Sequence, residues 1–168
     1  MNYIGIDPGF TGGIAVLDEK ADIVELYDMP VIPVGTKKEL DGPEITKILK
    51  VYIALVEAPN PAFRLGGAHV FIEKCQSMPS QGVVGVGRYM EGYGRLRGIC
   101  EGLSLPYTLV HPKTWKKDMM PDMDKSVKGN AEVRVKQLYP TIELPDRKKT
   151  DGLCDAVLIA RFGWSKDK

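Results

Sequence analysis

Alternating apolar and polar positions predict three short strands at the start of the chain, at Tyr3–Asp7, Ile14–Leu17 and Ile23–Tyr27. The connections between them are short, and the first contains a Gly-Gly pair. We therefore expect an antiparallel meander rather than a strand-helix-strand beginning. The proline-rich stretch Met29–Pro43 predicts a loop.

The remainder of the chain predicts helices that alternate with two more strands. Apolar residues recur at helical spacing between the two prolines Pro43 and Pro59, and later helices are bounded by further prolines. This order predicts a single domain over residues 1–168 with a mixed sheet, in which a meander lies at one side and later strands return through helices, as in an α/β or α+β sandwich. The later predicted strands are His69–Glu73 and Tyr107–Val110, the Gly-rich segment is Gly82–Gly102, and the later predicted helices are Lys113–Asp118, Asn130–Tyr139 and Lys149–Phe162.

Composition is typical of a folded protein, because 43% of the 168 residues are hydrophobic and 27% are charged. No apolar run approaches the ~20 residues that span a bilayer, so we expect no membrane partner. The first residues lack a basic segment and a cleavage site, which indicates a cytoplasmic protein. The three cysteines are far apart and form no Cys-x-x-Cys pair, so we expect buried reduced thiols rather than disulfides or zinc.

Acidic residues stand at the ends of two predicted strands. Asp7 closes the first strand and Glu73 closes the fourth. A carboxylate beside a hydrophobic core is costly unless a cation neutralises it, and hard divalent cations prefer oxygen ligands. The alternative for Asp7 is an Asx turn in Asp-Pro-Gly, which this triplet favours about equally.

Two more acids, Asp151 and Asp155, are four residues apart in the last predicted helix. On one helical face their Cβ atoms lie roughly 5 to 6 Å apart and the like charges repel, which a bound cation would relieve. For Asp151, an exposed position at the helix N-terminus, stabilised by the helix dipole, is a serious alternative. Asp155 adjoins the apolar stripe and is harder to explain without a ligand. The four acids together therefore predict a metal site.

The net charge of only +1 excludes a uniformly basic protein, so a polyanion would have to bind a local patch. Basic residues gather in three groups near the acids, although each group alone is also typical of a solvated helix face. The candidate DNA-binding residues are Arg88, Arg95 and Arg97, then Lys113, Lys116 and Lys117, and then Lys148 and Lys149, which follow Arg147.

Other chemistries have less support. The chain has no Gly-x-Ser-x-Gly, His-Glu-x-x-His or phosphate-binding P-loop motif and only two histidines. His111 before Pro112 is more typical of a capped loop histidine than of a catalyst, and Trp115 is more typical of a half-buried residue than of a base-stacking platform. Glycines at spacing four, Gly94 to Gly102, predict close packing against the sheet or a helix, or a dimer seam.

Five segments in order resemble the RuvC-type Holliday junction resolvases of the ribonuclease H-like superfamily, most of all the versions carried by tailed bacteriophages. The likeness runs from Met1 to about Phe162. The segments are Ile4-Gly-Ile-Asp-Pro-Gly9, Phe71-Ile-Glu-Lys74, Tyr93-Gly-Arg-Leu-Arg-Gly-Ile-Cys100, His111-Pro-Lys-Thr-Trp-Lys-Lys117 and Asp155-Ala-Val-Leu-Ile-Ala160.

This resemblance implies an α/β, ribonuclease H-like fold, in which a mixed five-stranded sheet of an antiparallel meander followed by parallel strands is flanked by helices. It also implies a homodimer that nicks paired strands of a four-way DNA junction with Mg²⁺ or Mn²⁺, two ions per site. Asp7, Glu73 and Asp155 match acids of the family. Bacterial members usually place the penultimate acid three residues before the last, where this chain has Gly152, so the role passes to Asp151 with less support. The residue that pries the junction open has no match near Gln76 to Met78. The implied location is the cytoplasm, or the host cytoplasm for a phage protein, in DNA recombination and repair.

Three other functions stay open. Within the enzyme class, broader cleavage of Y-shaped and three-way DNA would serve debranching. From other classes, the segment Gly5–Gly13 resembles the phosphate-binding hairpin of actin-like and sugar-kinase folds, which need two such domains. A non-catalytic DNA-binding module with the same fold is the third, and the intact acids argue against it.

Overall fold

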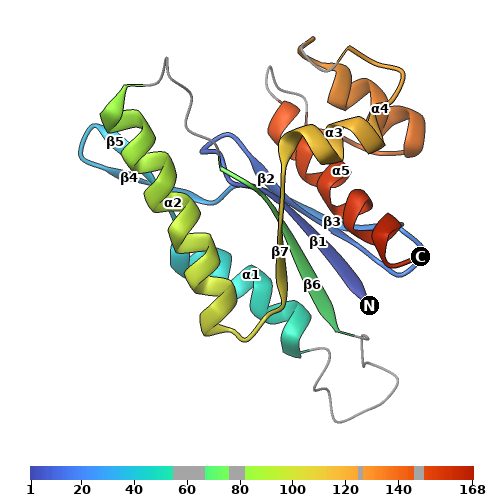
Figure 1. Cartoon of the computed structure of the whole chain (residues 1–168). Helices are drawn as coiled ribbons and strands as arrows, with labels where there is room; N and C mark the ends of the chain where they lie inside the picture. The colour runs from blue at the N-terminus through green and yellow to red at the C-terminus, as the bar shows by residue number, and fades with distance from the viewer. Residues whose placement is uncertain (55–66, 76–81, 125–126, 146–149) are drawn as a thin grey trace.

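A mixed sheet of five strands runs through the middle of the molecule and carries helices on both faces (Figure 1). The structure is a computed structural model that describes residues 1–54, 67–75, 82–124, 127–145 and 150–168. The strands are β1 (Asn2–Asp7), β2 (Gly13–Leu17), β3 (Ile23–Asp28), β4 (Val31–Val34), β5 (Lys37–Leu40), β6 (Ala68–Glu73) and β7 (Tyr107–Val110), and the helices are α1 (Gly42–Ala54), α2 (Val83–Gly102), α3 (Pro112–Met119), α4 (Asn130–Leu138) and α5 (Asp151–Lys166).

The sheet has the strand order β3-β2-β1-β6-β7. Strands β1, β2 and β3 form an antiparallel meander, whereas β6 is parallel to β1 and β7 is parallel to β6. The predicted α/β fold, with a meander followed by parallel strands, is therefore confirmed. Because β1 and β6 are parallel neighbours, their C-terminal ends lie at the same edge of the sheet.

Side chains that alternate along β1 divide between two hydrophobic cores. Ile4 and Ile6 pack with α1 and α2 on one face, whereas Tyr3 packs with α3, α4 and α5 on the other. Helix α5 lies directly against β1, since a Cβ added to Gly5 would be 2.1 Å from the Ala156 carbonyl oxygen. Strand parity therefore places the side chain of Asp7 on the α5 face.

The segment from Met29 to Pro43 is not a continuous loop, which corrects the prediction made from its prolines. It forms a separate two-stranded antiparallel hairpin of β4 and β5. Gly35, at φ 61°, provides the left-handed residue of the tight connection. Pro33 pairs opposite Lys38 and is tolerated because this short hairpin has two outer edges.

The Gly-rich segment forms the long helix α2. Tyr93, Leu96 and Cys100 bury one side of this helix in the core shared with α1. A Cβ added to Gly94, Gly98 or Gly102 would meet no atom of the described residues within 4 Å. The predicted close packing of these glycines within the chain is therefore wrong, and the stripe is open.

The remaining helices agree with their predictions within a few residues. Helix α1 ends at Ala54 and α5 runs on to Lys166, while the predicted start of α5 at Lys149 lies outside the described residues. Cys100 and Cys154 are buried free thiols, as expected, and Cys75 is half-buried. Across the described residues, no helix is both long enough and apolar enough to cross a membrane.

Candidate active site

Asp7 ends β1 with its two carboxylate oxygens in different environments. The Gly9 backbone N–H donates to Asp7 Oδ1 at 3.2 Å, so the Asx turn is present. Asp7 Oδ2 faces the first turn of α5, because a Cβ added to Gly152 would lie 2.8 Å from it. The turn therefore fixes the side chain without occupying the oxygen that points to α5.

Glu73 ends β6 at the same edge of the sheet as Asp7. The residue pairs between β1 and β6 continue up to Ile6 opposite Ile72, so the two acids follow adjacent paired positions. Trp115 Nε1 donates to Glu73 Oε2 at 2.8 Å, and the Lys74 N–H donates to the Val110 carbonyl oxygen at 2.7 Å. The side chain and the backbone of this strand end are therefore both held.

Asp155 comes from the second turn of α5, and its side chain is 20% exposed. Lys116 Nζ lies 3.8 Å from Asp155 Oδ2. The helix begins beside the turn between β1 and β2, where Gly12 forms a bridge with Gly152. Asp151, the first residue of α5, is exposed rather than buried.

Burial and mutual repulsion perturb the three buried acids together. Burial, followed by repulsion from Glu73, raises the pKa of Asp7 to about 6. Burial also raises the pKa of Asp155 to about 7, with Asp7, Glu73 and Asp151 adding to the rise and Lys116 opposing it. Burial raises the pKa of Glu73, against the Trp115 hydrogen bond and Lys116. Such a cluster of neighbouring raised carboxylates is typical of functional sites.

Solved structures of one protein share this arrangement of strands and helices. No family model and no curated protein matches the chain. A structure of T. thermophilus RuvC in complex with a Holliday junction substrate is similar with a TM-score of 0.58 and 17% identity, over 99% of this chain and 95% of that chain. A second Thermus thermophilus RuvC structure gives 0.50 and 18%, over 99% and 96%.

The chain has a RuvC-like, ribonuclease H-like fold. The fold implied by the sequence resemblance is thereby confirmed. Identities of 17 and 18% extend this conclusion to the fold alone, so function must be argued from the site itself.

The donor set in this RuvC-like fold suits a hard divalent cation. All three buried groups are carboxylates, and a cation would neutralise the repulsion that raises their pKa values. As the side chains stand in the described part of the chain, no group of three or more His, Cys, Asp or Glu is positioned to hold a metal ion. The set fits the chemistry of such an ion, and the ligand assignment stays a prediction.

The three arginines of α2 do not form one patch with the lysines of α3. Arg88 lines a cavity beside the hairpin of β4 and β5. Arg95 Nη1 donates to the Leu40 carbonyl oxygen at 2.6 Å. Arg97 Nε donates to the Tyr107 hydroxyl at 3.3 Å. Contacts of these three side chains with DNA stay predictions.

The basic residues of α3 divide between the acids and the solvent. Lys116 is half-buried beside Asp155, whereas Lys113 and Lys117 are exposed. His111 caps this helix, because its Nδ1 accepts from the Lys113 N–H at 3.2 Å. The sequence predicted a loop histidine at this position and not a helix cap. The predicted contacts Lys148 and Lys149 lie outside the described residues, as does the Gln76 to Met78 segment.

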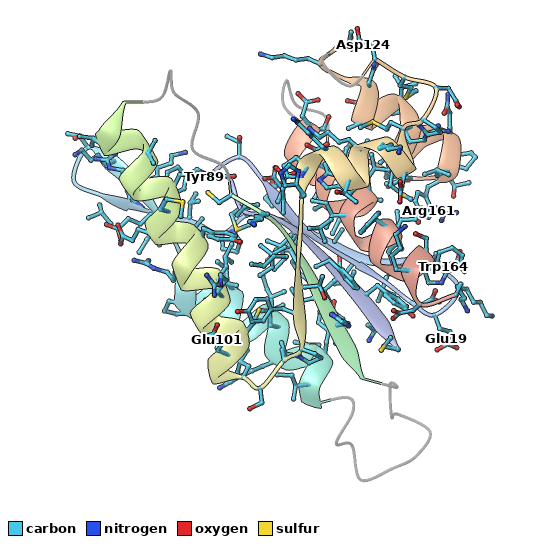
Figure 2. All side chains as sticks on the ribbon, viewed as in Figure 1. Glu19, Tyr89, Glu101, Asp124, Arg161 and Trp164 are labelled. Carbon is cyan, nitrogen blue, oxygen red and sulfur yellow. The ribbon has the colours of Figure 1, made fainter. Side chains whose placement is uncertain are left out.

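Sequence reasoning missed two aromatic residues near the acids. Trp115 is fully buried rather than half-buried, and it donates to Glu73. Tyr89 lies on the side of α2 that faces the strands (Figure 2) and hydrogen-bonds with Cys75. Its pKa is raised mainly by burial, and the nearby Cys75, Asp7 and Glu73 raise it further. The lysines on both sides of Trp115 were the sequence feature that could have indicated its place near the site. Nothing in the sequence pattern distinguished Tyr89.

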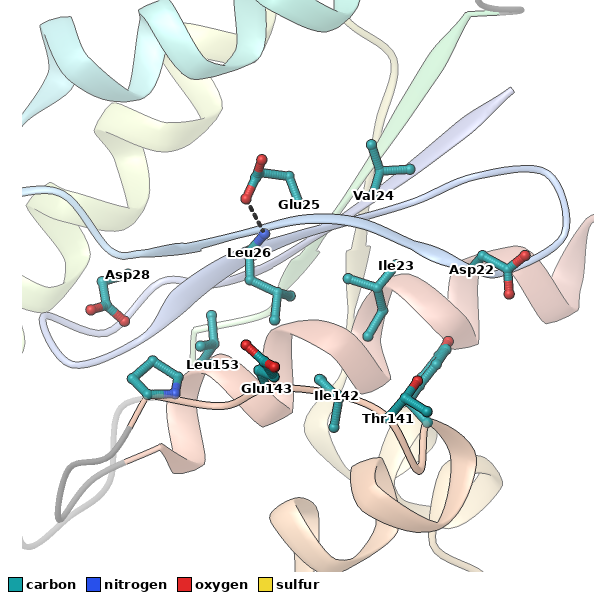
Figure 3. A pocket seen from close by; sticks show the side chains of 12 residues that line it. Asp22, Ile23, Val24, Glu25, Leu26, Asp28, Thr141, Ile142, Glu143 and Leu153 are labelled. Atoms are coloured by element: carbon teal, nitrogen blue, oxygen red, sulfur yellow. Dashed lines mark hydrogen bonds between the residues drawn. The ribbon is translucent and has the colours of Figure 1, made fainter.

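Two cavities differ in how they relate to the acids. One of about 210 Å³ is lined by Lys116, Lys128, Asp151 and Asp155, so Lys128 is a further cation beside the site. The other, of about 580 Å³, lies between β3 and residues 139–145 (Figure 3). Four acids line it, and Figure 3 shows the Glu25 carboxylate against the Leu26 N–H, at 3.4 Å. Such a lining does not suit a polyanion.

Proposed function

We propose that this protein is a metal-dependent endodeoxyribonuclease that resolves Holliday junctions by paired, symmetric nicking of phosphodiester bonds. The observation that carries the proposal is the group of Asp7, Glu73 and Asp155, three partly buried acids on one face of the sheet edge with raised pKa values. The RuvC-like fold supports it, since one structure with that fold is a complex with a Holliday junction substrate.

The residues of this chain would hold the ligands in place. The Gly9 N–H fixes Asp7, and the Trp115 N–H fixes Glu73. Asp7, Glu73 and Asp155 would bind two Mg²⁺ or Mn²⁺ ions, with Asp151 as a fourth acid at the rim. Divalent ions held there would activate water and neutralise charge in phosphodiester hydrolysis.

Lys116 has two contacts that fit a role in the same reaction. Its Nζ lies 3.8 Å from Asp155 and 5.0 Å from the centre of the Trp115 ring. With Asp155 committed to a bound ion, Lys116 would be free to contact a phosphate oxygen of the substrate. Lys113 and Lys117, exposed on the same helix, would contact neighbouring phosphates.

A homodimer would match the approximate two-fold symmetry of a four-way junction, with one active site for each of two strands. The open stripe of Gly94, Gly98 and Gly102 on α2 offers a surface on which two helices can approach closely. Val84 and Met90 are exposed on the same helix and add apolar surface that a dimer could bury. Recombination, repair and, for a phage-encoded enzyme, processing of branched genomes in the host cytoplasm are the processes that this activity would serve.

The test uses a labelled four-way junction and a linear duplex of matched sequence, each with Mg²⁺ or with EDTA. We expect symmetric nicks in the junction alone, and only with metal. Asp7→Asn should retain junction binding and lose cutting. Glu19→Gln is the matched control, because Glu19 pairs with the Met1 amino group at the opposite end of β1.

Equal cutting by Asp7→Asn and the parent would remove Asp7 from the site. Cutting of Y-shaped and three-way DNA at the same rate as the four-way junction would favour the debranching activity instead. Binding without any metal-dependent cutting by the parent would favour a non-catalytic DNA-binding module, and ATP binding would favour the actin-like alternative.

A further inference from the structure

The hairpin of β4 and β5 is a separate element beside the N-terminal half of α2 (Figure 1). Its two strands pair with each other and are not part of the five-stranded sheet. Its base is closed by the Asp41 N–H, which donates to the Pro30 carbonyl oxygen at 2.9 Å. A short hairpin is marginally stable alone, so its packing against α2 must hold it.

Two contacts fix the hairpin on α2. Leu40, which is 1% exposed, packs so closely on Gly92 that a Cβ there would lie 3.2 Å from Leu40 Cδ1. Arg95 donates to the Leu40 carbonyl oxygen at 2.6 Å and pairs with Glu39 and Glu91, both at 3.2 Å. Arg95 is therefore a positioning residue, and its charge is balanced by the two acids.

The other cations of this region are not balanced. A cavity of about 230 Å³ between the hairpin and α2 is lined by Lys37, Lys38 and Arg88, with Phe10 at one side. Lys37 and Lys38 are exposed, and none of the three cations forms an ion pair with any described residue. Since Arg95 already occupies the two acids of the lining, this wall presents three uncompensated positive charges.

This wall lies at the same end of the molecule as the acids. Phe10 is three residues beyond Asp7, in the turn that follows β1. Arg88 adjoins Tyr89, the residue whose hydroxyl is influenced by Asp7 and Glu73. Asp7 lies on the α5 face of the sheet and α2 on the other, so a DNA arm that reaches both would pass over the sheet edge where β1 and β6 end.

We propose that the hairpin of β4 and β5, together with Arg88, is a second anchor for DNA that grips the phosphate backbone of one arm of the branched substrate. The inference rests on the proposed function, because it takes the acids as the point of cleavage. Exposed lysines and a half-buried arginine suit contacts with phosphate oxygens, which position a nucleic acid without reading its sequence. The anchor would add affinity and orient the arm without sequence preference.

Counterion release sets the size of the expected effect. The slope of log K against log salt is negative, and each lost phosphate contact reduces its magnitude by about 0.9 on duplex DNA. Lys37→Gln with Lys38→Gln should therefore lower the slope by about 2 and weaken junction binding by about 10- to 100-fold near 0.1 M salt. Arg88→Gln alone should lower the slope by about 1.

The experiment measures binding of a labelled four-way junction by fluorescence anisotropy in EDTA, at several salt concentrations. The matched control is Lys20→Gln with Lys50→Gln, which removes the same charge from exposed positions in the β2–β3 connection and α1. Thermal unfolding checks that every variant folds. Weaker binding and a lower slope in the hairpin variant, with the control like the parent, support the anchor.

Two results would overturn the anchor. One is a hairpin variant that folds and binds with the affinity and slope of the parent, and the other is an equal loss in the control pair, which would reduce the effect to net charge. Cleavage in Mg²⁺ separates this inference from the proposed function. If the parent cuts the junction and the hairpin variant binds normally, only the second anchor is refuted. If the parent binds through the hairpin but never cuts, only the proposed nuclease activity is refuted.

Discussion

Replacing Asp7 by asparagine should stabilise the metal-free protein at neutral and alkaline pH. Asp7 is buried at the end of β1 near Glu73, and its pKa rises from an ordinary 3.8 to about 6. That rise corresponds to about 3 kcal/mol by which the folded state disfavours the ionised carboxylate. Asparagine removes the charge and keeps an oxygen to accept from the Gly9 N–H.

The neutral amide accepts a weaker hydrogen bond than the carboxylate, which offsets about 1 kcal/mol. The expected net gain at pH 8 is therefore about 2 kcal/mol, or a rise in Tm of about 4 to 8 °C for a domain of this length. Below pH 4 the parent carboxyl is protonated in both states, so the gain should vanish. The parent should correspondingly lose stability as the pH rises from about 4 through about 6.

The assay is thermal and urea unfolding of the parent and Asp7→Asn between pH 4 and pH 8 in EDTA, then with Mg²⁺. Mg²⁺ should stabilise the parent and stabilise the variant less, because metal binds only the folded site. Asp151→Asn is the control, since this exposed residue at the start of α5 should lose at most about 1 kcal/mol of helix-terminus stabilisation. An Asp7→Asn midpoint at or below that of the parent at pH 8 in EDTA would refute the buried-charge argument.

Three further changes test how the site is held. Trp115→Phe removes the donor that lies 2.8 Å from Glu73 Oε2, so the free energy of unfolding should fall by about 1 to 3 kcal/mol. Without that hydrogen bond the pKa of Glu73 should rise further, so the acidic limb of the pH–rate profile for cleavage should move to higher pH. Lys116→Gln removes the cation that opposes the raised pKa of Asp155, so that limb should also move to higher pH, as pH–rate profiles would show. Gly152→Ala places a Cβ 2.3 Å from a backbone oxygen of the β1–β2 turn and should cost about 1 to 3 kcal/mol in urea unfolding, whereas Gly98→Ala meets open space and should not.

The sequence was sufficient for the fold because its strands are short, apolar and separated by clear turns. The cost of unpaired buried carboxylates predicted that Asp7 and Glu73 belong to one site, but no local pattern specifies that β6 pairs with β1, so their adjacency in the sheet depended on the family resemblance. The hairpin was missed because Pro33 and Pro30 outweighed the alternation around Gly35.

Long-range contacts explain the other misses. Trp115 is fully buried because α3 follows β7 in the chain and β7 pairs with β6, which places α3 next to β6. That pairing exists only in the assembled sheet. The open glycine stripe of α2 follows from which side of that helix carries Tyr93 and Leu96 into the core. Periodicity alone cannot separate a glycine face that packs within the chain from one that stays open.

The packing of α5 explains why position 152 carries no acidic side chain. The resemblance places an acid three residues before Asp155, at position 152, where this chain has glycine. The bridge between Gly12 and Gly152 brings the backbone so close that any Cβ at 152 would lie 2.3 Å from the Thr11 carbonyl oxygen. With no room for a side chain there, position 152 cannot supply a carboxylate to the proposed site. Asp151 adjoins it, at the exposed start of the helix, which explains why it influences Asp155 while staying in solvent.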